Sequence, residues 1–246
     1  MLNLRCGEVK TDFKMLCRIA DLYVEVPEGG GLDARCKEYI TSDKVDADIT
    51  ILEERYDPSR WPMLTGDNLA YMDSGLIFYS KLIRLGGMML HSSAVELDGK
   101  AYLFSGPCGM GKSTHTRLWK KVFEGARIFN DDKPALRFID GVWYAYGTPW
   151  CGKDGININL RAPLAGICFL KRGSENKISR LSPLQATSAI LTQTFRRFGT
   201  SEGLDIMIAT LNNLVANVPV YELYCLPNED AARLSHKTMS QANEEE

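Results

Sequence analysis

Eight residues at positions 106–113, Gly-Pro-Cys-Gly-Met-Gly-Lys-Ser, restrict the fold of this chain more than any other part of the sequence. Their spacing is G-x-x-x-x-G-K-[ST], and they lie between an apolar segment that favours a strand and a segment that favours a helix. Glycine permits the backbone angles with which several amide groups converge on phosphate oxygens. We call residues 106–113 the glycine loop, and we predict that it binds ATP or another nucleoside triphosphate together with Mg²⁺.

Each part of the glycine loop has an expected role toward the nucleotide. The side chain of Lys112 is expected to reach the β- and γ-phosphates, and the hydroxyl of Ser113 to ligate Mg²⁺. The helix that begins here adds the positive end of its dipole, with Thr114 assisting at the helix start. The backbone groups expected to surround the phosphates belong to Gly106, Gly109, Met110 and Gly111.

The strand that enters the glycine loop is expected to be one arm of a tight hairpin. Residues 88–97 and 100–105 flank Asp98-Gly99, a dipeptide that favours a two-residue type I′ turn between antiparallel strands. A second hairpin of the same kind is expected at residues 135–146. In common folds with such a loop the entering strand has parallel neighbours joined by helices, so a hairpin at this point narrows the possible topologies.

Two adjacent carboxylates follow a short predicted strand. Asp131 and Asp132 come about 18 residues after the loop lysine, where a metal-binding acid is expected beside such a loop. One would hold Mg²⁺ together with Ser113, and the other would accept the proton of an attacking hydroxyl. Both are catalytic candidates and Asp131 is a candidate metal ligand, although the sequence does not assign the two roles. The alternative is a solvated turn, because Asn-Asp pairs are common in turns.

Other candidate site residues lie on both sides of the carboxylates. His91 is expected on the strand that pairs with the one entering the glycine loop, from which it could face the γ-phosphate or the acceptor. The alternative is a structural role, which is the more common one for a lone histidine. Residues 147–153 and Arg161 offer cations and an aromatic ring, a composition found in lids over active sites and also in ordinary surface loops. Arg161 is therefore a further catalytic candidate.

The remaining pattern predicts an α/β fold with a mixed sheet. Residues 1–86 are expected to form a small N-terminal α/β accessory region, residues 87–240 a nucleotide-binding catalytic domain, and residues 241–246 a frayed tail. Strands are expected at 22–26, 48–52, 164–170 and 220–226, and helices at 68–85, 113–123, 183–195, 204–216 and from 229 onward.

Composition excludes some classes of partner. The net charge of −2 and the pI near 6.0 give no overall field that would draw the chain onto nucleic acid or an anionic membrane. The N-terminal segment lacks the apolar stretch of a secretory signal, and 7 scattered cysteines without a CxxC pair fit a reducing compartment. A cytoplasmic protein with neither a nucleic-acid nor a membrane partner is expected, and a homo-oligomer is possible.

The segment from His91 to Ser113, followed by Asn130-Asp131-Asp132, resembles the catalytic core of the HPr kinase/phosphorylase family, which is related in fold to PEP carboxykinase. The resemblance spans about residues 88–170. It implies a PEP carboxykinase-like P-loop core that transfers the γ-phosphoryl group of ATP to a serine hydroxyl. It also implies phosphate and Mg²⁺ roles for Lys112 and Ser113, an acidic pair at Asp131 and Asp132, and a histidine near the transfer site at His91.

The sequence departs from that family in two places. Residues 147–153 do not carry the signature of HPr kinase, and its C-terminal segment for binding a carrier protein is not found. The chain looks more similar to the small HPr kinase-related proteins, some of which modify peptides or free serine. The expected partner is a phosphoryl acceptor with a hydroxyl, in a protein, a peptide or a small molecule. The alternatives are a nucleotide-sensing module without transferase activity, a PEP carboxykinase-like enzyme and a scaffold.

Overall fold

The computed structural model describes residues 82–194 and 201–241, positions 75, 78 and 79, and the backbone of six strands within residues 2–51. The chain divides into two compact units, Met1–Leu82 and Ile83–Glu246. Among the helices that the structure describes, none combines the length and the apolar character needed to cross a membrane.

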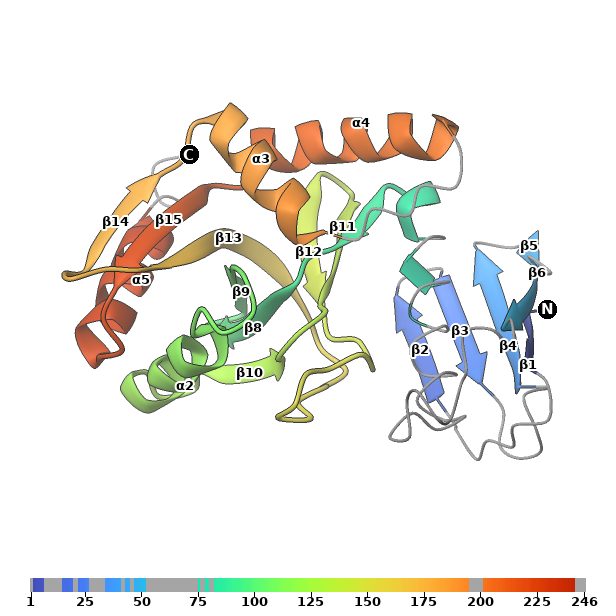
Figure 1. Ribbon diagram of the computed structural model, residues 1–246, viewed down its shortest axis with the longest axis horizontal. Helices are drawn as coiled ribbons and strands as arrows, with labels where there is room; N and C mark the ends of the chain where they lie inside the picture. The colour runs from blue at the N-terminus through green and yellow to red at the C-terminus, as the bar shows by residue number, and fades with distance from the viewer. Residues whose placement is uncertain are drawn as a thin grey trace, which may run out of the picture. The chain divides into compact units, whose positions relative to one another are not determined.

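The N-terminal unit contains a six-stranded sheet with the order β2-β3-β4-β1-β6, and β5 pairs with β4 (Figure 1). The pair β1–β6 is parallel, and the other pairs are antiparallel. The strands predicted at 22–26 and 48–52 correspond to β3 and β6, and the other four strands were not predicted. The helix predicted from residue 68 lies largely outside the described residues. The bounds are β1 Leu2–Cys6, β2 Met15–Ile19, β3 Leu22–Val26, β4 Ala34–Ile40, β5 Asp43–Lys44 and β6 Ala47–Ile51.

The C-terminal unit is built on a curled, mixed sheet of nine strands. Its path is β10-β8-β9-β13-β12-β11-β7, and β15 pairs with both β13 and β14. β9, β13 and β15 run parallel, whereas the other pairs are antiparallel. The bounds are β7 Gly87–Met89, β8 Ser92–Leu97, β9 Lys100–Ser105, β10 Arg127–Asn130, β11 Ala135–Ile139, β12 Val142–Tyr146, β13 Arg161–Arg172, β14 Lys177–Arg180 and β15 Val220–Cys225.

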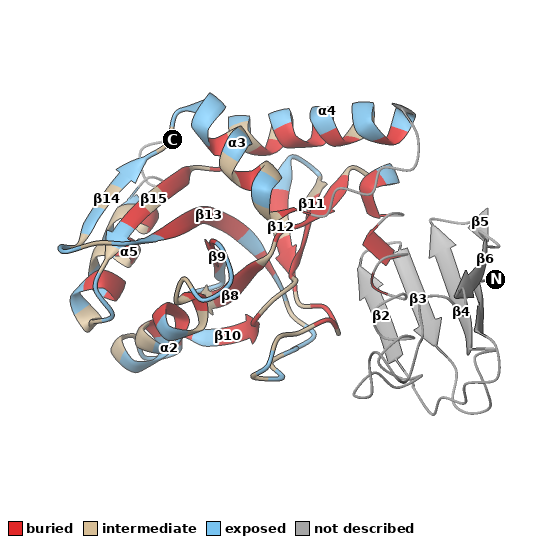
Figure 2. Cartoon of the chain, in the orientation of Figure 1, coloured by how far each residue is buried: buried red, intermediate tan, exposed pale blue. Residues whose placement is uncertain are grey.

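Helices cover both faces of the central strands, so the unit has three layers (Figure 1). Alternate residues of β9 point to opposite faces: Leu103 belongs to the core under α3 and α4, and Phe104 belongs to the core under α2 and α5. Figure 2 shows the buried residues along these strands and on the inward faces of the helices. The bounds are α2 Lys112–Val122, α3 Pro183–Gln193, α4 Ser201–Asn217 and α5 Glu229–Gln241.

Both predicted hairpins are present. Asp98 and Gly99 have φ angles of 52° and 75°, and Asp140 and Gly141 have φ angles of 50° and 84°. Positive φ at both central residues is the geometry of a type I′ turn, whose twist matches that of the flanking strands. β8 therefore pairs with β9 directly before the glycine loop, with Leu97 opposite Lys100.

The strand predicted at 88–97 is two strands rather than one. β7 ends at Met89 and pairs with β11, whereas β8 begins at Ser92 and pairs with β9. The curl of the sheet separates these pairings, and His91 lies in the break between them. His91 is therefore not on a paired strand as predicted, and its backbone is available for contacts with other elements.

Candidate functional site

The glycine loop turns sharply between the end of β9 and the start of α2. Gly106, Gly109 and Gly111 have φ angles of 143°, 76° and 102°, a region that side chains with a Cβ rarely adopt. At Gly106 a Cβ would also lie 3.3 Å from the carbonyl oxygen of Leu170. Because α2 begins at Lys112, its unpaired N-terminal amides and its dipole are directed at the space above the loop.

The Lys112 side chain folds back over the loop that precedes it. Its Nζ donates hydrogen bonds to the carbonyl oxygens of Gly106 at 2.9 Å and Pro107 at 3.4 Å. Burial lowers the pKa of the Lys112 ammonium, and the negative charge of Asp132 acts in the opposite direction. An ammonium group has three rotatable donors, so it can exchange loop carbonyls for phosphate oxygens at small cost.

His91 and Asp132 contact each other, and a hydrogen bond connects His91 to the end of β9. The Nε2 atom of His91 lies 3.1 Å from Oδ1 of Asp132, and the Lys133 ammonium lies 2.5 Å from Oδ2. The hydroxyl of Ser105, the residue before the glycine loop, donates to the carbonyl oxygen of His91 at 2.8 Å. The backbone amide of Ser92 donates to the carbonyl oxygen of Asp132 at 3.0 Å. The pair is therefore positioned by both strands of the hairpin that enters the loop.

Opposing effects act on the carboxyl group of Asp132. Burial by itself raises its pKa, but hydrogen bonds from His91 and Lys133, together with the charge of Lys133, bring the pKa down to about 2. Asp132 is consequently ionised at neutral pH, with one oxygen directed to His91 and the other to Lys133.

Asp131 has different partners from Asp132. Its Oδ1 accepts a hydrogen bond from the Gly152 amide at 2.7 Å, and its Oδ2 accepts one from the Asp154 amide at 3.0 Å. Asp154 in turn pairs with Arg117 of α2 at 2.6 Å. Since Arg117 is four residues after Ser113, both lie on one face of α2. Asp131 thus fastens the segment after β12 beside the start of α2, a role that the sequence did not reveal.

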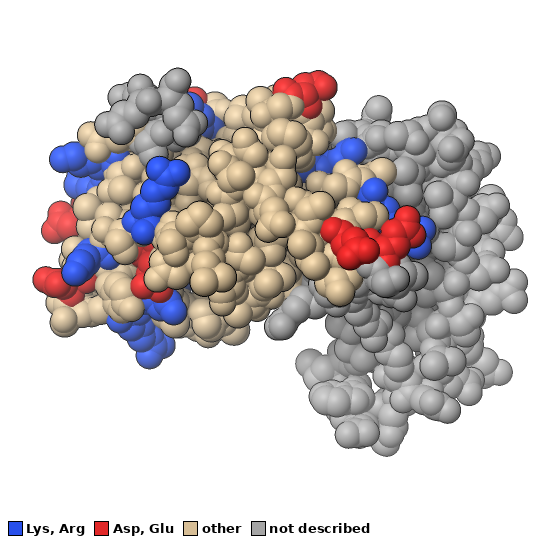
Figure 3. Space-filling view, turned by 90° about the horizontal axis from the view of Figure 1, so that it is seen from above, with Lys and Arg blue, Asp and Glu red and all other residues tan. Residues whose placement is uncertain are grey.

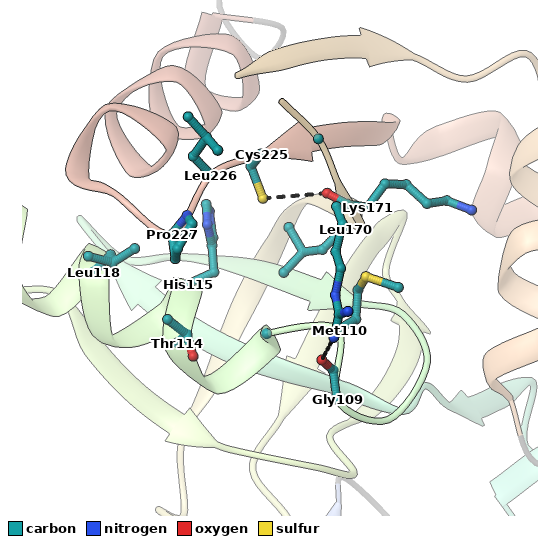
Figure 4. Close-up of a pocket in the computed structure, with 13 residues that line it drawn as sticks. Gly109, Met110, Thr114, His115, Leu118, Leu170, Lys171, Cys225, Leu226 and Pro227 are labelled. Carbon is teal, nitrogen blue, oxygen red and sulfur yellow. Dashed lines mark hydrogen bonds between the residues drawn. The ribbon is translucent and has the colours of Figure 1, made fainter. Parts of the chain in front are cut away.

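A cavity of about 360 Å³ lies on the α2 side of the glycine loop. Figure 4 shows Thr114, His115 and Leu118 of α2 on one side with Leu226 and Pro227 next to them, and Gly109, Met110 and Leu170 on the other side. Arg172, at the end of β13, donates to the carbonyl oxygen of Gly109 at 3.4 Å. Four of the predicted nucleotide-binding residues line this cavity: Gly109, Met110, Gly111 and Thr114.

A second pocket, of about 450 Å³, lies on the other side of the loop. Gly106 and Pro107 form one edge, and the exposed face of α3 forms the opposite one. At its end is Gln193, whose Oε1 lies 3.1 Å from Nδ1 of His91 and whose carbonyl oxygen accepts a hydrogen bond from the His91 amide at 2.8 Å. We call this pocket the α3 groove.

The structure does not bring Arg161 to the loop. Arg161 is the first residue of β13, and the loop is flanked by the other end of that strand, where Phe169 pairs with Ser105. Eight residues of strand at about 3.3 Å each separate the two ends, roughly 26 Å along the chain. The Arg161 guanidinium instead lies over the Tyr144 ring, 5.0 Å from its centroid. The structure thus places Arg161 beside Tyr144 rather than beside the glycine loop.

The oxygen donors beside the glycine loop bear on whether Mg²⁺ could bind there. Within the described part of the chain, no group of three or more His, Cys, Asp and Glu side chains is arranged to hold a metal ion. Magnesium bound with a nucleotide needs only one or two carboxylates, because phosphates and waters supply its other ligands. Ser113, Asp131 and Asp132 offer oxygen donors of the kind that Mg²⁺ takes, and phosphate oxygens and waters would have to supply its other ligands.

A protein family matches the chain, and a solved structure is weakly similar to it. A family model described as "SynChlorMet cassette protein ScmC" matches residues 67–227, which is more than half of the chain. Among solved structures, the Hpr(Ser) kinase/phosphatase from Coxiella burnetii is similar with a TM-score of 0.37 and 12% identity, over 64% of this chain and 95% of that one. At that TM-score the likeness is a weak one at the level of the fold. No curated protein matches the sequence.

Proposed function

This chain belongs to the ScmC family of SynChlorMet cassette proteins, and we propose that it is an ATP-dependent kinase that transfers the γ-phosphoryl group to a hydroxyl, with serine as the acceptor type. The observation that carries the proposal is the attachment of the His91–Asp132 pair to Ser105, the residue before the glycine loop. A loop suited to polyphosphate and a carboxylate suited to a hydroxyl are thereby held together.

The catalytic unit of the proposal is a PEP carboxykinase-like P-loop core within residues 87–240. Two features support it: the type I′ hairpin that leads into the glycine loop, and the parallel pairing of β9 with β13 at the loop. The nucleoside is assigned to the cavity lined by Thr114 and Leu118, because this cavity adjoins the loop on the side of α2.

The residues have distinct roles in the proposed transfer. The Lys112 ammonium and the amides at the start of α2 stabilise negative charge on the phosphoryl oxygens. Ser113 and Asp131 would hold Mg²⁺, which would neutralise negative charge on the phosphates. Asp132 receives the hydroxyl proton while the new O–P bond forms and the bond to the ADP oxygen breaks. His91 holds Asp132 in position.

The low pKa of Asp132 bears on the order of these events. A carboxylate with a pKa of about 2 is a weak base, so it does not remove the hydroxyl proton before the transfer begins. In a loose transition state the attacking oxygen keeps its proton until late, when the new bond makes the proton acidic. The proposed role of Asp132 is therefore to orient the hydroxyl first and to accept the proton late.

The test is incorporation of radiolabelled γ-phosphate from ATP into serine-containing acceptors. Wild type is expected to incorporate label, and Asp132→Asn is expected to lose at least about tenfold in rate, which corresponds to about 1.4 kcal/mol in the barrier. Asp205→Asn is the matched control, because Asp205 is exposed on α4. Undiminished transfer by Asp132→Asn would refute the assigned role. Binding of Mg·ATP without transfer to any acceptor or to water would favour a nucleotide-sensing module.

A further inference from the structure

The α3 groove lies where the acceptor of a phosphoryl transfer has to enter. Gly106 and Pro107 of the glycine loop form one edge, and the other side is formed by α3. Its far end is Gln193, whose side chain contacts the ring nitrogen of His91 that faces away from Asp132. The cavity assigned to the nucleoside is on the opposite side of the loop. A molecule in the α3 groove therefore meets the glycine loop at Gly106 and Pro107, and at Gln193 it is one side chain away from the His91–Asp132 pair.

The walls of the groove carry almost no net charge. α3, with the sequence PLQATSAILTQ, contains no Asp, Glu, Lys or Arg. The charged groups among the lining residues are Lys171 and Glu222, whose side chains pair with each other at 3.6 Å. Figure 3 shows a broad area without Lys, Arg, Asp or Glu in the middle of the face that includes α3 and α4. A charged occupant would find no opposite charge on this helix to replace the water that it loses.

The dimensions of the groove favour an extended chain over a single amino acid. Its lining positions on α3 are Leu184, Gln185, Ser188, Ala189, Thr192 and Gln193, which repeat at four-residue spacing along one stripe of the helix. From Leu184 to Gln193 the stripe is about 13 Å long at 1.5 Å per residue. An extended peptide rises about 3.3 Å per residue, so about four residues fill that length.

The two ends of the groove differ in chemistry. At the outer end Leu184 is 80% exposed, and Leu181 lines the groove nearby. At the inner end Thr192 and Gln193 offer hydrogen-bonding groups beside the His91–Asp132 pair. An occupant with an apolar side chain at one end and a hydroxyl at the other matches both ends.

We propose that the α3 groove binds an uncharged, extended segment of a peptide or protein, with an apolar side chain on Leu184 and a serine or threonine hydroxyl at Gln193. The proposal rests on the kinase function proposed above and names the class of acceptor. The hydroxyl, placed between Gly106 and Gln193, is the group that receives the γ-phosphoryl, and Gln193 links this position to the His91–Asp132 pair.

Binding is tested on the full chain with fluorescently labelled tetrapeptides, in the presence of Mg²⁺ and a non-hydrolysable ATP analogue. The probes are an uncharged peptide, Leu-Ala-Ala-Ser with blocked ends, its acidic counterpart Asp-Glu-Glu-Ser, and free serine as a competitor. The uncharged peptide is expected to bind at least tenfold more tightly than the acidic one, and free serine is not expected to displace it. Equal binding of both peptides, displacement by free serine, or binding of neither peptide overturns the proposal.

A pair of matched variants locates the bound peptide. Ser188 is exposed and lines the groove, so Ser188→Trp fills the groove without disturbing the core. Asn212 is exposed on α4 and does not line the groove, so Asn212→Trp is the control. We expect Ser188→Trp to weaken peptide binding at least tenfold and Asn212→Trp to leave it unchanged. Equal effects of the two variants contradict the assigned location.

Incorporation of label separates this proposal from the kinase function. In one outcome the peptide binds, Ser188→Trp abolishes this binding, and no γ-phosphate is incorporated. This outcome refutes the kinase function but leaves the α3 groove as a peptide site. In another outcome γ-phosphate is incorporated into the acidic peptide or into free serine, and Ser188→Trp does not change the amount. This outcome refutes the assignment of the acceptor to the α3 groove and leaves the kinase function.

Discussion

His115 is a buried titratable side chain on α2, the helix that begins at the glycine loop, and it makes the stability of this region depend on pH. Its ring is 3% exposed, packs 4.5 Å from the Phe104 ring between centroids, and has Nε2 3.0 Å from the hydroxyl oxygen of Ser235. Burial lowers its pKa from 6.5 to about 4. The folded state therefore keeps a neutral ring at pH values where the unfolded chain binds a proton.

The sign and the size of the effect follow from linkage. The pKa of His115 is lower in the folded state than in the unfolded chain. The contribution of the neutral His115 ring to the free energy of unfolding is therefore present above pH 6.5 and is lost as the pH falls toward 4. With these two values the free energy of unfolding should fall by about 2 kcal/mol between pH 7 and pH 5. This window lies above the range in which Asp132, with a pKa of about 2, takes up a proton.

Urea unfolding followed by tryptophan fluorescence at pH 7, 6 and 5 measures this loss. His115→Gln removes the titrating group, so its free energy of unfolding should fall by about 2 kcal/mol less than that of wild type over the same interval. His236→Gln is the comparison, because burial lowers the pKa of His236 in the same direction while its ring is only partly buried. If His115→Gln loses as much stability as wild type from pH 7 to pH 5, His115 is not a buried neutral ring.

Three further predictions concern the loop after β12 and the His91–Asp132 pair. Gly147→Ala would place a Cβ 1.9 Å from the carbonyl oxygen of Ile158, so the backbone must move. We expect the free energy of unfolding, measured by thermal unfolding, to fall by about 1–3 kcal/mol; an unchanged melting temperature contradicts this packing. Asp131→Asn leaves an acceptor for only one of the two backbone amides that Asp131 binds. Limited proteolysis within residues 147–160 should therefore become faster; a variant as resistant to the protease as wild type would contradict the anchoring role. His91→Gln should lower phosphoryl transfer at least about tenfold and leave Mg·ATP affinity unchanged, whereas equal losses in both would assign His91 to nucleotide binding.

The sequence predicted those parts of the fold that short-range chemistry determines. Both Asp-Gly hairpins are present because positive φ angles at two adjacent residues are a local requirement. The start of α3 is equally local: the Ser182 amide donates to Oε1 of Gln185 at 3.0 Å, and Pro183 occupies the first helical position. Elements with weak patterns were missed, including β14 and four strands of the N-terminal sheet.

The sequence named candidate site residues but did not indicate how they are arranged. The glycine spacing pointed to Lys112, and the adjacent acids were found from their distance along the chain. Three parts of the arrangement escaped prediction: the break in the sheet at His91, the division of partners between Asp131 and Asp132, and the contact of Gln193 with His91. The last joins residues 102 positions apart, and only the folded sheet brings them together.

The central claim is that the glycine loop binds a nucleoside triphosphate, and titration of the full chain with Mg·ATP by isothermal calorimetry tests it most directly. We predict saturable binding at one site per chain, weakened at least about tenfold by Lys112→Met, because this change removes the ammonium that lies over the loop while keeping an unbranched side chain. Absence of binding at millimolar Mg·ATP, or equal affinity of wild type and Lys112→Met, would contradict the account.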